Sequence, residues 1–493
     1  MSRPSFVLRS IVAVGLMIGF YVLAAGISGG LLYLAYADMA YGRQIHPRVI
    51  LGCGICAFMI LKGCFFMSDS FEEPGPEVTE AQEPGLFALI RRVATKLQAK
   101  MPQHVYLVPD VNAFVAEVGG WMGIIGTRRI LGVGVGMMNS VSTRQLEAVL
   151  AHEFGHYHGG DTRLGGFLYR TRGSIGRVVV NLGADSALSK PFEWYGTLFL
   201  RLTQAISRAQ ELTADEFSVK VAGKKAHLAA LRGTAAGGML YDQFLNGEVK
   251  TVLEEGFAPG NIYDGLRLYI ANLGDAGALK DLDRWLQKRR TDPYDSHPAL
   301  AERLAQGKQL AGPPLEDSLE LARSVLKQPD RTEETMTRRF LDRVIHLDKA
   351  KPIRWEQVPE LVYGAQLTRA STALARALGA TKPDGTSSLV DALSREKRLD
   401  LARRIAPGAF EQSRPDAQDL AMKVVTHAAA GWVAAVLVRD FGYRYAAAPG
   451  RPITVVSPAG QSVDPFALVG PAAKNPAEAP FLRQKLQALG LAS

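Results

Sequence analysis

Cysteine is almost absent from this chain. The 493 residues include three cysteines, Cys53, Cys56 and Cys64, and all three lie in one apolar segment near the N-terminus. The rest of the chain therefore cannot form a disulfide framework, which is compatible with a reducing compartment. The Cys53-x-x-Cys56 spacing could also indicate a redox or metal site, but small apolar residues in a membrane helix are the favoured interpretation.

Charged side chains are missing from residues 10–37. A helix crosses the hydrocarbon core of a bilayer with about 20 residues, so this stretch is long enough to span. A signal peptide is the alternative, because Arg3 and Arg9 precede the stretch and Ala35-Tyr36-Ala37 resembles a cleavage site. Signal peptides have an apolar region of only about 7–15 residues. We therefore expect an uncleaved membrane helix.

A second apolar run covers residues 49–67 and carries one charge, Lys62, which can reach the interface. The two runs predict a transmembrane hairpin within residues 1–68 of a multi-pass protein of the cell membrane. The N-terminus and the large domain then share one side. The basic N-terminus and Lys62 favour the cytoplasm for that side, whereas Arg43 and Arg48 in the intervening loop oppose it.

Lysine and arginine are also missing from residues 69–85, which are acidic and rich in proline and glycine. Self-repulsion and proline predict an extended linker here. The net charge of +9 comes from arginines scattered along helical stretches, with no basic-aromatic module, so nucleic acid is not expected as a partner.

Alternating apolar residues predict strands at residues 104–108 and 129–136, after a helix over residues 86–100. In the second strand Gly132 and Gly134 share one face, where glycine permits close approach of another backbone. A protease can use such an edge to add its substrate as a strand, which makes these glycines candidate substrate-binding residues. A glycine-relieved core strand is an equal alternative.

Two helices follow. Ser142 and Gln145 fit a capping box, which predicts the start of the first helix. Gly159-Gly160 predicts its end. The second helix is expected over residues 191–221, with Gly223 after it.

The first of these helices contains His152-Glu153-Phe154-Gly155-His156. Histidines four residues apart share one helical face and can ligate one ion, and neutral imidazole suits Zn²⁺. Glu153 is placed to take a proton from a water that the metal activates. The pattern predicts a zinc hydrolase with Glu153 as catalytic base.

The second helix supplies Glu211 and Asp215, again four residues apart. A catalytic zinc needs a third protein ligand and an open position, and Glu211 can complete a His₂Glu set with His152 and His156. Asp215 can hydrogen-bond a ligating imidazole. A solvated acidic helix face is the alternative, but the upstream motif favours a site with one Zn²⁺ per chain.

These motifs resemble the HtpX and type I CaaX-prenyl-protease class of integral-membrane gluzincin metallopeptidases. The resemblance covers about residues 86–306. The matching segments are Asn112-Ala113-Phe114, Leu146 through His156, Ser207-Arg208, Glu211, Ala214-Asp215, Ser296-His297-Pro298 and Glu302-Arg303.

The resemblance implies the same roles for His152, His156, Glu211 and Glu153. It also places His297 at a His-Pro position near the active site, where it could stabilise the oxyanion or hold the substrate. A helix-capping histidine is the alternative. Asn112 joins Gly132 and Gly134 as a candidate substrate-binding residue.

The expected fold is α+β and mainly helical. A transmembrane hairpin (1–68) and an acidic linker (69–85) precede a gluzincin-like zinc peptidase domain with a small β-sheet (86–311). A helical extension (312–409) and a small C-terminal domain (410–493) follow, the latter with strands expected at 433–438 and 453–456. The chain departs from the resembling class in that residues 164–206 are amphipathic rather than membrane-spanning, and residues after 312 have no recognised counterpart.

The predicted function is a membrane-anchored zinc endopeptidase acting on protein or peptide substrates, with membrane protein quality control as the expected role. The lipid bilayer is the other expected partner. An inactive protease-like scaffold or chaperone is the alternative, although the complete His, Glu, His, Glu set opposes it. Zinc-dependent hydrolysis of a non-peptide bond is a third interpretation, and the glycine-bearing strand favours an extended peptide over it.

Overall fold

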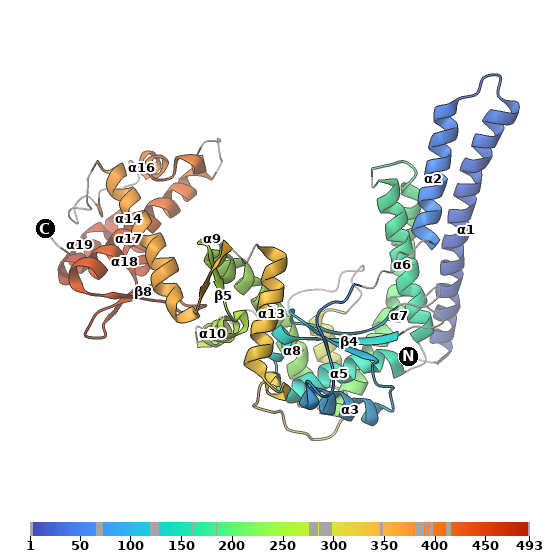
Figure 1. Cartoon of the computed structure of the whole chain (residues 1–493), viewed down its shortest axis with the longest axis horizontal. Helices are drawn as coiled ribbons and strands as arrows, with labels where there is room; N and C mark the ends of the chain where they lie inside the picture. The colour runs from blue at the N-terminus through green and yellow to red at the C-terminus, as the bar shows by residue number, and fades with distance from the viewer. Residues whose placement is uncertain are drawn as a thin grey trace. The chain divides into compact units, whose positions relative to one another are not determined.

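The computed structural model describes residues 3–65, 72–118, 128–158, 162–183, 185–275, 284, 298–345, 349–379, 389–390, 393, 398–410 and 416–491. The chain divides into two compact units. The first comprises residues 1–239 and 280–332, and the second comprises residues 240–279 and 333–493. The prediction of an α+β, mainly helical chain with an apolar N-terminal hairpin is confirmed (Figure 1).

The described elements of the first unit are the helices α1 (Arg3–Tyr41), α2 (Pro47–Phe65), α3 (Pro84–Leu97), α4 (Val135–Met138), α5 (Thr143–His158), α6 (Thr162–Leu182), α7 (Lys190–Ala222), α8 (Lys224–Phe244, which ends in the second unit), α12 (Leu300–Gly307) and the 3-10 turn η2 (Ala322–Val325), with strands β1 (Glu77–Val78), β2 (His104–Val108), β3 (Ala113–Val118) and β4 (Arg128–Gly134).

The α1–α2 hairpin matches the two predicted apolar runs: α1 extends the first run at both ends, and α2 begins two residues before the second run and ends at Phe65. Residues 11–41 of α1 and 47–64 of α2 are long and apolar enough to cross a membrane. The two helices pack side by side, and α6 and α7 pack against them along part of their length (Figure 1). Large apolar side chains elsewhere on α1 face outward, including Val22 and Leu32. This exposure is what a lipid-facing helix requires.

The sheet of the first unit has the strand order β1-β2-β4-β3. β4 is parallel to β2 and antiparallel to β3, so both of its edges are already paired. The prediction that this glycine-bearing strand offers an edge to substrate is therefore wrong. The space at Gly132 is filled by the Phe114 ring, and a Cβ at Gly134 would lie 2.0 Å from the Asp110 carbonyl oxygen.

The acidic segment is not a free linker, contrary to the prediction. Glu77 and Val78 pair with β2 as an added antiparallel strand, and the Leu107 amide donates to the Pro76 carbonyl. Glu83 is buried, and its carboxylate accepts hydrogen bonds from the Lys327 amide and the Thr332 hydroxyl. Hydrogen bonding and burial fix residues 76–83 to the peptidase fold despite their like charges.

The helix α5 begins as its sequence predicts. Ser142 and Gln145 form the two reciprocal bonds of a capping box. The backbone N–H of Ser142 donates to the side-chain Oε1 of Gln145, and the backbone N–H of Gln145 donates to the Ser142 hydroxyl oxygen. The predicted Gly159-Gly160 terminus lies outside the described residues. The second predicted helix is α7, and Gly223 follows it with a positive φ of 89°.

The helices α5 and α7 pack closely along their length. Gly155 allows this approach, because a Cβ there would lie 2.9 Å from Ala214 Cα on α7. The buried Ser218 hydroxyl on α7 donates to the Ala148 carbonyl of α5. Close packing brings the histidine face of α5 against the acidic face of α7.

The described elements of the second unit are α9 (Lys250–Glu254), α10 (Ile262–Asp275), α13 (Pro329–Val344, which begins in the first unit), α14 (Ala365–Ala377), α16 (Arg398–Ile405), α17 (Ala417–Phe441), α18 (Pro465–Lys474), α19 (Ala479–Ala488), the π-helical turns η1 (Leu245–Val249) and η5 (Pro359–Gly364), the 3-10 turns η4 (Trp355–Gln357), η6 (Pro407–Phe410) and η7 (Pro476–Glu478), and strands β5 (Phe257–Pro259), β6 (Lys351–Ile353), β7 (Arg444–Ala446), β8 (Thr454–Val456) and β9 (Ser462–Val463).

The helix α17 forms the centre of the second unit. It is apolar and long enough to cross a membrane, but most of it is buried against other helices of the unit. The predicted strand at 433–438 is wrong, because these residues belong to α17 and a short apolar run fits a buried helix equally well. The predicted strand at 453–456 is confirmed as β8.

The predicted boundary at residue 312 does not coincide with the two units. Residues 313–332 stay with the first unit, where the Glu320 carbonyl accepts from the Thr143 amide and Asp317 accepts from the Ser142 hydroxyl. Residues 240–279 instead join the second unit. Hydrogen bonds between segments so far apart in sequence cannot be predicted from the local composition on which the boundary at 312 was based.

Candidate metal centre

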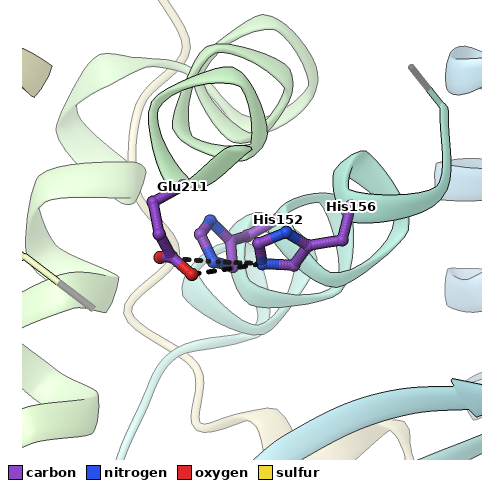
Figure 2. A group of neighbouring side chains, drawn as sticks. All are labelled: His152, His156 and Glu211. Carbon is purple, nitrogen blue, oxygen red and sulfur yellow. Dashed lines mark hydrogen bonds and ion pairs between the residues drawn. The ribbon is translucent and has the colours of Figure 1, made fainter. Parts of the chain in front are cut away.

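His152, His156 and Glu211 converge on one point between α5 and α7 (Figure 2). The two Nε2 atoms are 3.2 Å apart. Each lies 3.6 Å from an oxygen of the Glu211 carboxylate, His152 from Oε2 and His156 from Oε1. Glu211 is buried and His152 is largely buried, whereas His156 is more open. The two imidazoles and the carboxylate thus form a compact group of side chains that could hold one metal ion.

Asp215 lies one turn beyond Glu211 and orients the first histidine. Its Oδ1 atom is 3.0 Å from Nδ1 of His152, on the opposite side of the ring from Nε2. A bond from Nδ1–H to a carboxylate fixes the imidazole tautomer that leaves Nε2 free for a metal. Burial alone would raise the pKa of Asp215, but hydrogen bonds from His152 and Arg303 lower it far below its ordinary value.

Arg303 on α12 completes this arrangement. Its Nη2 and Nε atoms donate to the two oxygens of Asp215 at 2.5 and 3.1 Å, and its Nη1 lies 3.5 Å from Glu211 Oε2. Burial opposes the charge of the guanidinium, but the bonds to Asp215 raise its pKa above the ordinary value. A bidentate arginine restricts the rotation of the carboxylate that it holds.

Besides His152, Asp215 has another histidine next to it, His227 of α8. It is buried, its Nδ1 is 2.9 Å from Ser218 Oγ, and its Nε2 is 4.0 Å from Asp215 Oδ1. Burial lowers the pKa of His227 to about 4, against the opposing effect of Asp215. His227 is therefore neutral near pH 7 and packs against the carboxylate without adding charge.

The other predicted site residues are not all gathered here. His297 lies outside the described residues. Asn112 is exposed immediately before β3, and its carbonyl accepts from the Gly134 amide. β3, the last strand of the sheet within the described residues, contacts α5. Glu153 lies between the two histidines on α5 and is partly buried.

Arg303 and His227 had no predicted role. Arg303 is 88 residues from Asp215 in sequence, and His227 is 12 residues beyond it on another helix. The Glu302-Arg303 match gave the one signal for Arg303, and no pattern pointed to His227. Residues that come together only through tertiary packing have no fixed spacing in the sequence from which their contact could be predicted.

Comparison with known proteins agrees with this geometry. The model of peptidase family M48 matches residues 80–311. Residues 80–311 are a peptidase domain of family M48. The chain is also similar to proteins named Protease HtpX, and no solved structure matches it.

Three of these relatives indicate the extent of the likeness. The Idiomarina loihiensis protease is 29% identical over 173 residues, which cover 31% of this chain and 58% of the relative. The Tolumonas auensis protease is 27% identical over 266 residues, covering 48% and 82%. The Serratia proteamaculans protease is 27% identical over 239 residues, covering 39% and 78%. The M48 domain and the apolar helices identify a membrane-associated metallopeptidase, and they do not favour an inactive scaffold.

Proposed function

We propose that this M48 peptidase is a zinc-dependent endopeptidase whose single Zn²⁺ is held by His152, His156 and Glu211. The spacing of the donor atoms carries the proposal. Tetrahedral zinc with bonds of about 2.0–2.1 Å separates two ligand atoms by about 3.3–3.4 Å. The two imidazole Nε2 atoms are 3.2 Å apart here, and each lies 3.6 Å from a different oxygen of the Glu211 carboxylate. Two imidazoles and one carboxylate are also one of the donor sets that hold catalytic zinc.

When bound, the ion polarises the scissile carbonyl and makes the attacking water more acidic. Glu153 accepts the proton of that water and passes it to the leaving amine. On α5 Glu153 directly follows His152 and lies three residues before His156, so helical geometry places it next to the proposed ligands. Asp215 holds the His152 ring, and Arg303 holds Asp215, so the orientation of this proposed metal ligand is fixed before substrate binds.

The substrates we propose are protein or peptide segments in extended conformation. β3 contacts α5 and is the last strand of the sheet within the described residues, so a further strand could be added beside it, and Asn112 immediately precedes it. His297 is proposed to stabilise the oxyanion or to hold the substrate, on the resemblance alone. A role in membrane protein quality control fits an endopeptidase tied to the bilayer.

We also propose that α1 and α2 both cross the cell membrane and leave the peptidase domain in the cytoplasm. The N-terminal arginines and Lys62 lie on the domain side of this hairpin. Arg43 and Arg48 lie at the opposite end and weaken the charge asymmetry. A soluble part without cysteine supports the cytoplasmic side.

Two variants of the detergent-purified full chain test the function. Wild type is expected to carry about one zinc per chain and to cleave casein. Glu211→Ala should lose both zinc and activity. Glu153→Gln should keep the zinc and lose about 10²–10⁴-fold in rate, because the amide cannot accept a proton.

The outcomes separate the metal assignment from the mechanism. Full zinc occupancy in Glu211→Ala would show that the third ligand is another residue. Near wild-type cleavage by zinc-loaded Glu153→Gln would exclude Glu153 as the base. A wild type that binds zinc but cleaves nothing in a broad peptide library would support the scaffold alternative.

A further inference from the structure

The helices α6 and α7 form a hairpin whose end lies against the membrane-spanning helices. Within α6, Val178 packs on Gly63 of α2, where a Cβ would lie 2.7 Å from Val178 Cγ2. The Asn181 side chain donates to the Met59 carbonyl of α2 at 3.2 Å. Met59 is five residues inside the apolar span that ends at Cys64, which is about 8 Å along a helix.

The second arm of the hairpin makes the same approach to α1. The Tyr195 hydroxyl of α7 donates to the Leu16 carbonyl at 2.5 Å, and Gly19 leaves room for it. The rings of Phe192 and Phe20 meet edge to face, with centroids 6.3 Å apart. Leu16 and Phe20 both lie inside the apolar span of α1.

The hairpin end does not follow the spans to their far side. α1 and α2 continue well beyond it (Figure 1). It carries Asp185, Lys190 and Glu193, of which Lys190 and Glu193 form an ion pair at 2.9 Å. Charged residues of this number oppose a position at the centre of a bilayer but suit its interface.

Large apolar side chains on the hairpin point outward at this level. Val180 is 76% exposed and Trp194 is 70% exposed. On α1, Ile18 and Val22 are also exposed close to the Tyr195 contact. Exposed apolar side chains of the hairpin therefore occur at the same level as those of a proposed membrane span. Tryptophan is enriched where a protein meets the headgroup region.

We infer that the end of the α6–α7 hairpin, around Val180 and Trp194, is immersed in the lipid leaflet on the side of the peptidase domain. The immersion is partial, reaching the boundary between headgroups and acyl chains. Asn181 and Tyr195, the neighbours of Val180 and Trp194, contact Met59 and Leu16 about 8 Å inside the apolar spans, which agrees with the 5–10 Å at which interfacial helices lie. Polarity rises away from the end of the hairpin, because Arg172, two turns earlier on α6, is exposed. The inference rests on the proposal that α1 and α2 cross the bilayer.

Site-directed spin labelling in liposomes tests this depth. The three cysteines are first replaced by alanine in the full chain, and single cysteines are then introduced by Val180→Cys and Trp194→Cys. Arg172→Cys is the matched control on the same helix, and Leu32→Cys on α1 is the control for lipid exposure. Zinc content and peptidase activity of each labelled protein verify that it is folded.

The readout is collision of the nitroxide with oxygen, which dissolves in lipid, relative to a nickel chelate, which stays in water. Labels at 180 and 194 should show a severalfold higher oxygen preference than the label at 172, close to that at 32. Nickel accessibility at 180 and 194 equal to that at 172 would overturn the inference. Immobile labels reached by neither reagent would also overturn it, since a second protein surface would then cover the hairpin.

The label at residue 32 separates the inference from the proposal beneath it. If that label prefers oxygen while those at 180 and 194 prefer nickel, α1 spans the bilayer and the hairpin stays in water. If the label at 32 also prefers nickel, the spanning role of α1 is refuted together with the inference.

Discussion

Asp215→Asn is expected to weaken zinc binding without changing any ligand. In the native protein the Asp215 carboxylate accepts from His152 Nδ1 at 3.0 Å and from Arg303 at 2.5 and 3.1 Å. Asparagine keeps the shape but replaces one acceptor oxygen with an NH₂ group and removes the negative charge. The His152 ring is then held less firmly, and the Arg303 charge loses its main partner.

The uncompensated guanidinium has a second effect. Its Nη1 is already 3.5 Å from Glu211 Oε2, so Arg303 can compete with the metal for that carboxylate. Loss of a group that orients a ligand costs about 10–100-fold in metal affinity. We expect the Kd for zinc to rise by that factor, which is about 1.4–2.7 kcal/mol of binding free energy.

Competition with a chromophoric chelator measures this Kd on the detergent-purified full chain. Glu216→Gln is the matched control, because it makes the same chemical change one residue along α7 on an exposed side chain. The control should bind zinc as tightly as wild type. Wild-type affinity in Asp215→Asn, or equal weakening in both variants, would refute the proposed orienting role.

Three further predictions concern a buried carboxylate, a buried histidine and the proposed membrane topology. The Glu147 side chain is 1% exposed and lies within 3.2 Å of Arg144, Arg92 and Lys96, so Glu147→Ala should destabilise the domain by about 1–3 kcal/mol and lower Tm. The control Glu80→Ala breaks an exposed ion pair and should cost less than about 1 kcal/mol. Equal shifts in Tm for the two variants would contradict this prediction. The pKa of His227 is about 4 in the folded state and 6.5 ordinarily, so between these pH values the unfolded chain binds one more proton than the folded chain. The free energy of unfolding therefore falls as the pH decreases, by at most about 1.4 kcal/mol per pH unit. His227→Gln should lose less Tm than wild type between pH 6.5 and 4.5, and an unchanged dependence of Tm on pH would exclude this linkage. Protease added to intact spheroplasts should spare the large domain, and its digestion there would reverse the proposed topology.

Local patterns in the sequence were sufficient for the elements that carry the site. The capping box at Ser142 and the glycine at 223 predicted where α5 begins and α7 ends, because each acts within one helical turn. The spacing of His152, His156 and Glu211 predicted which faces of the two helices meet. Residues four apart share a face on any helix, whatever the rest of the fold.

Pairings between distant segments could not be predicted in the same way. The period of two in residues 129–136 indicates the two faces of a strand but not its neighbours, so the interior position of β4 was missed. The acidic composition of residues 69–85 hid the pairing of β1 and the burial of Glu83. The apolar run at 433–438 fitted a strand or a helix, and burial in the second unit decides for the helix.

If Trp194 lies at the membrane as we infer, the continuous helix α7 sets the distance between the bilayer and the proposed zinc site. Trp194 and Glu211 lie on it 17 residues apart, which is about 26 Å at 1.5 Å per residue. An extended substrate covers that length with about eight residues at 3.3 Å each. A protein anchored in the same bilayer would therefore be cleaved no closer than about eight residues from its membrane end. Shorter juxtamembrane tails would escape, so tail length by itself would select among membrane-bound substrates.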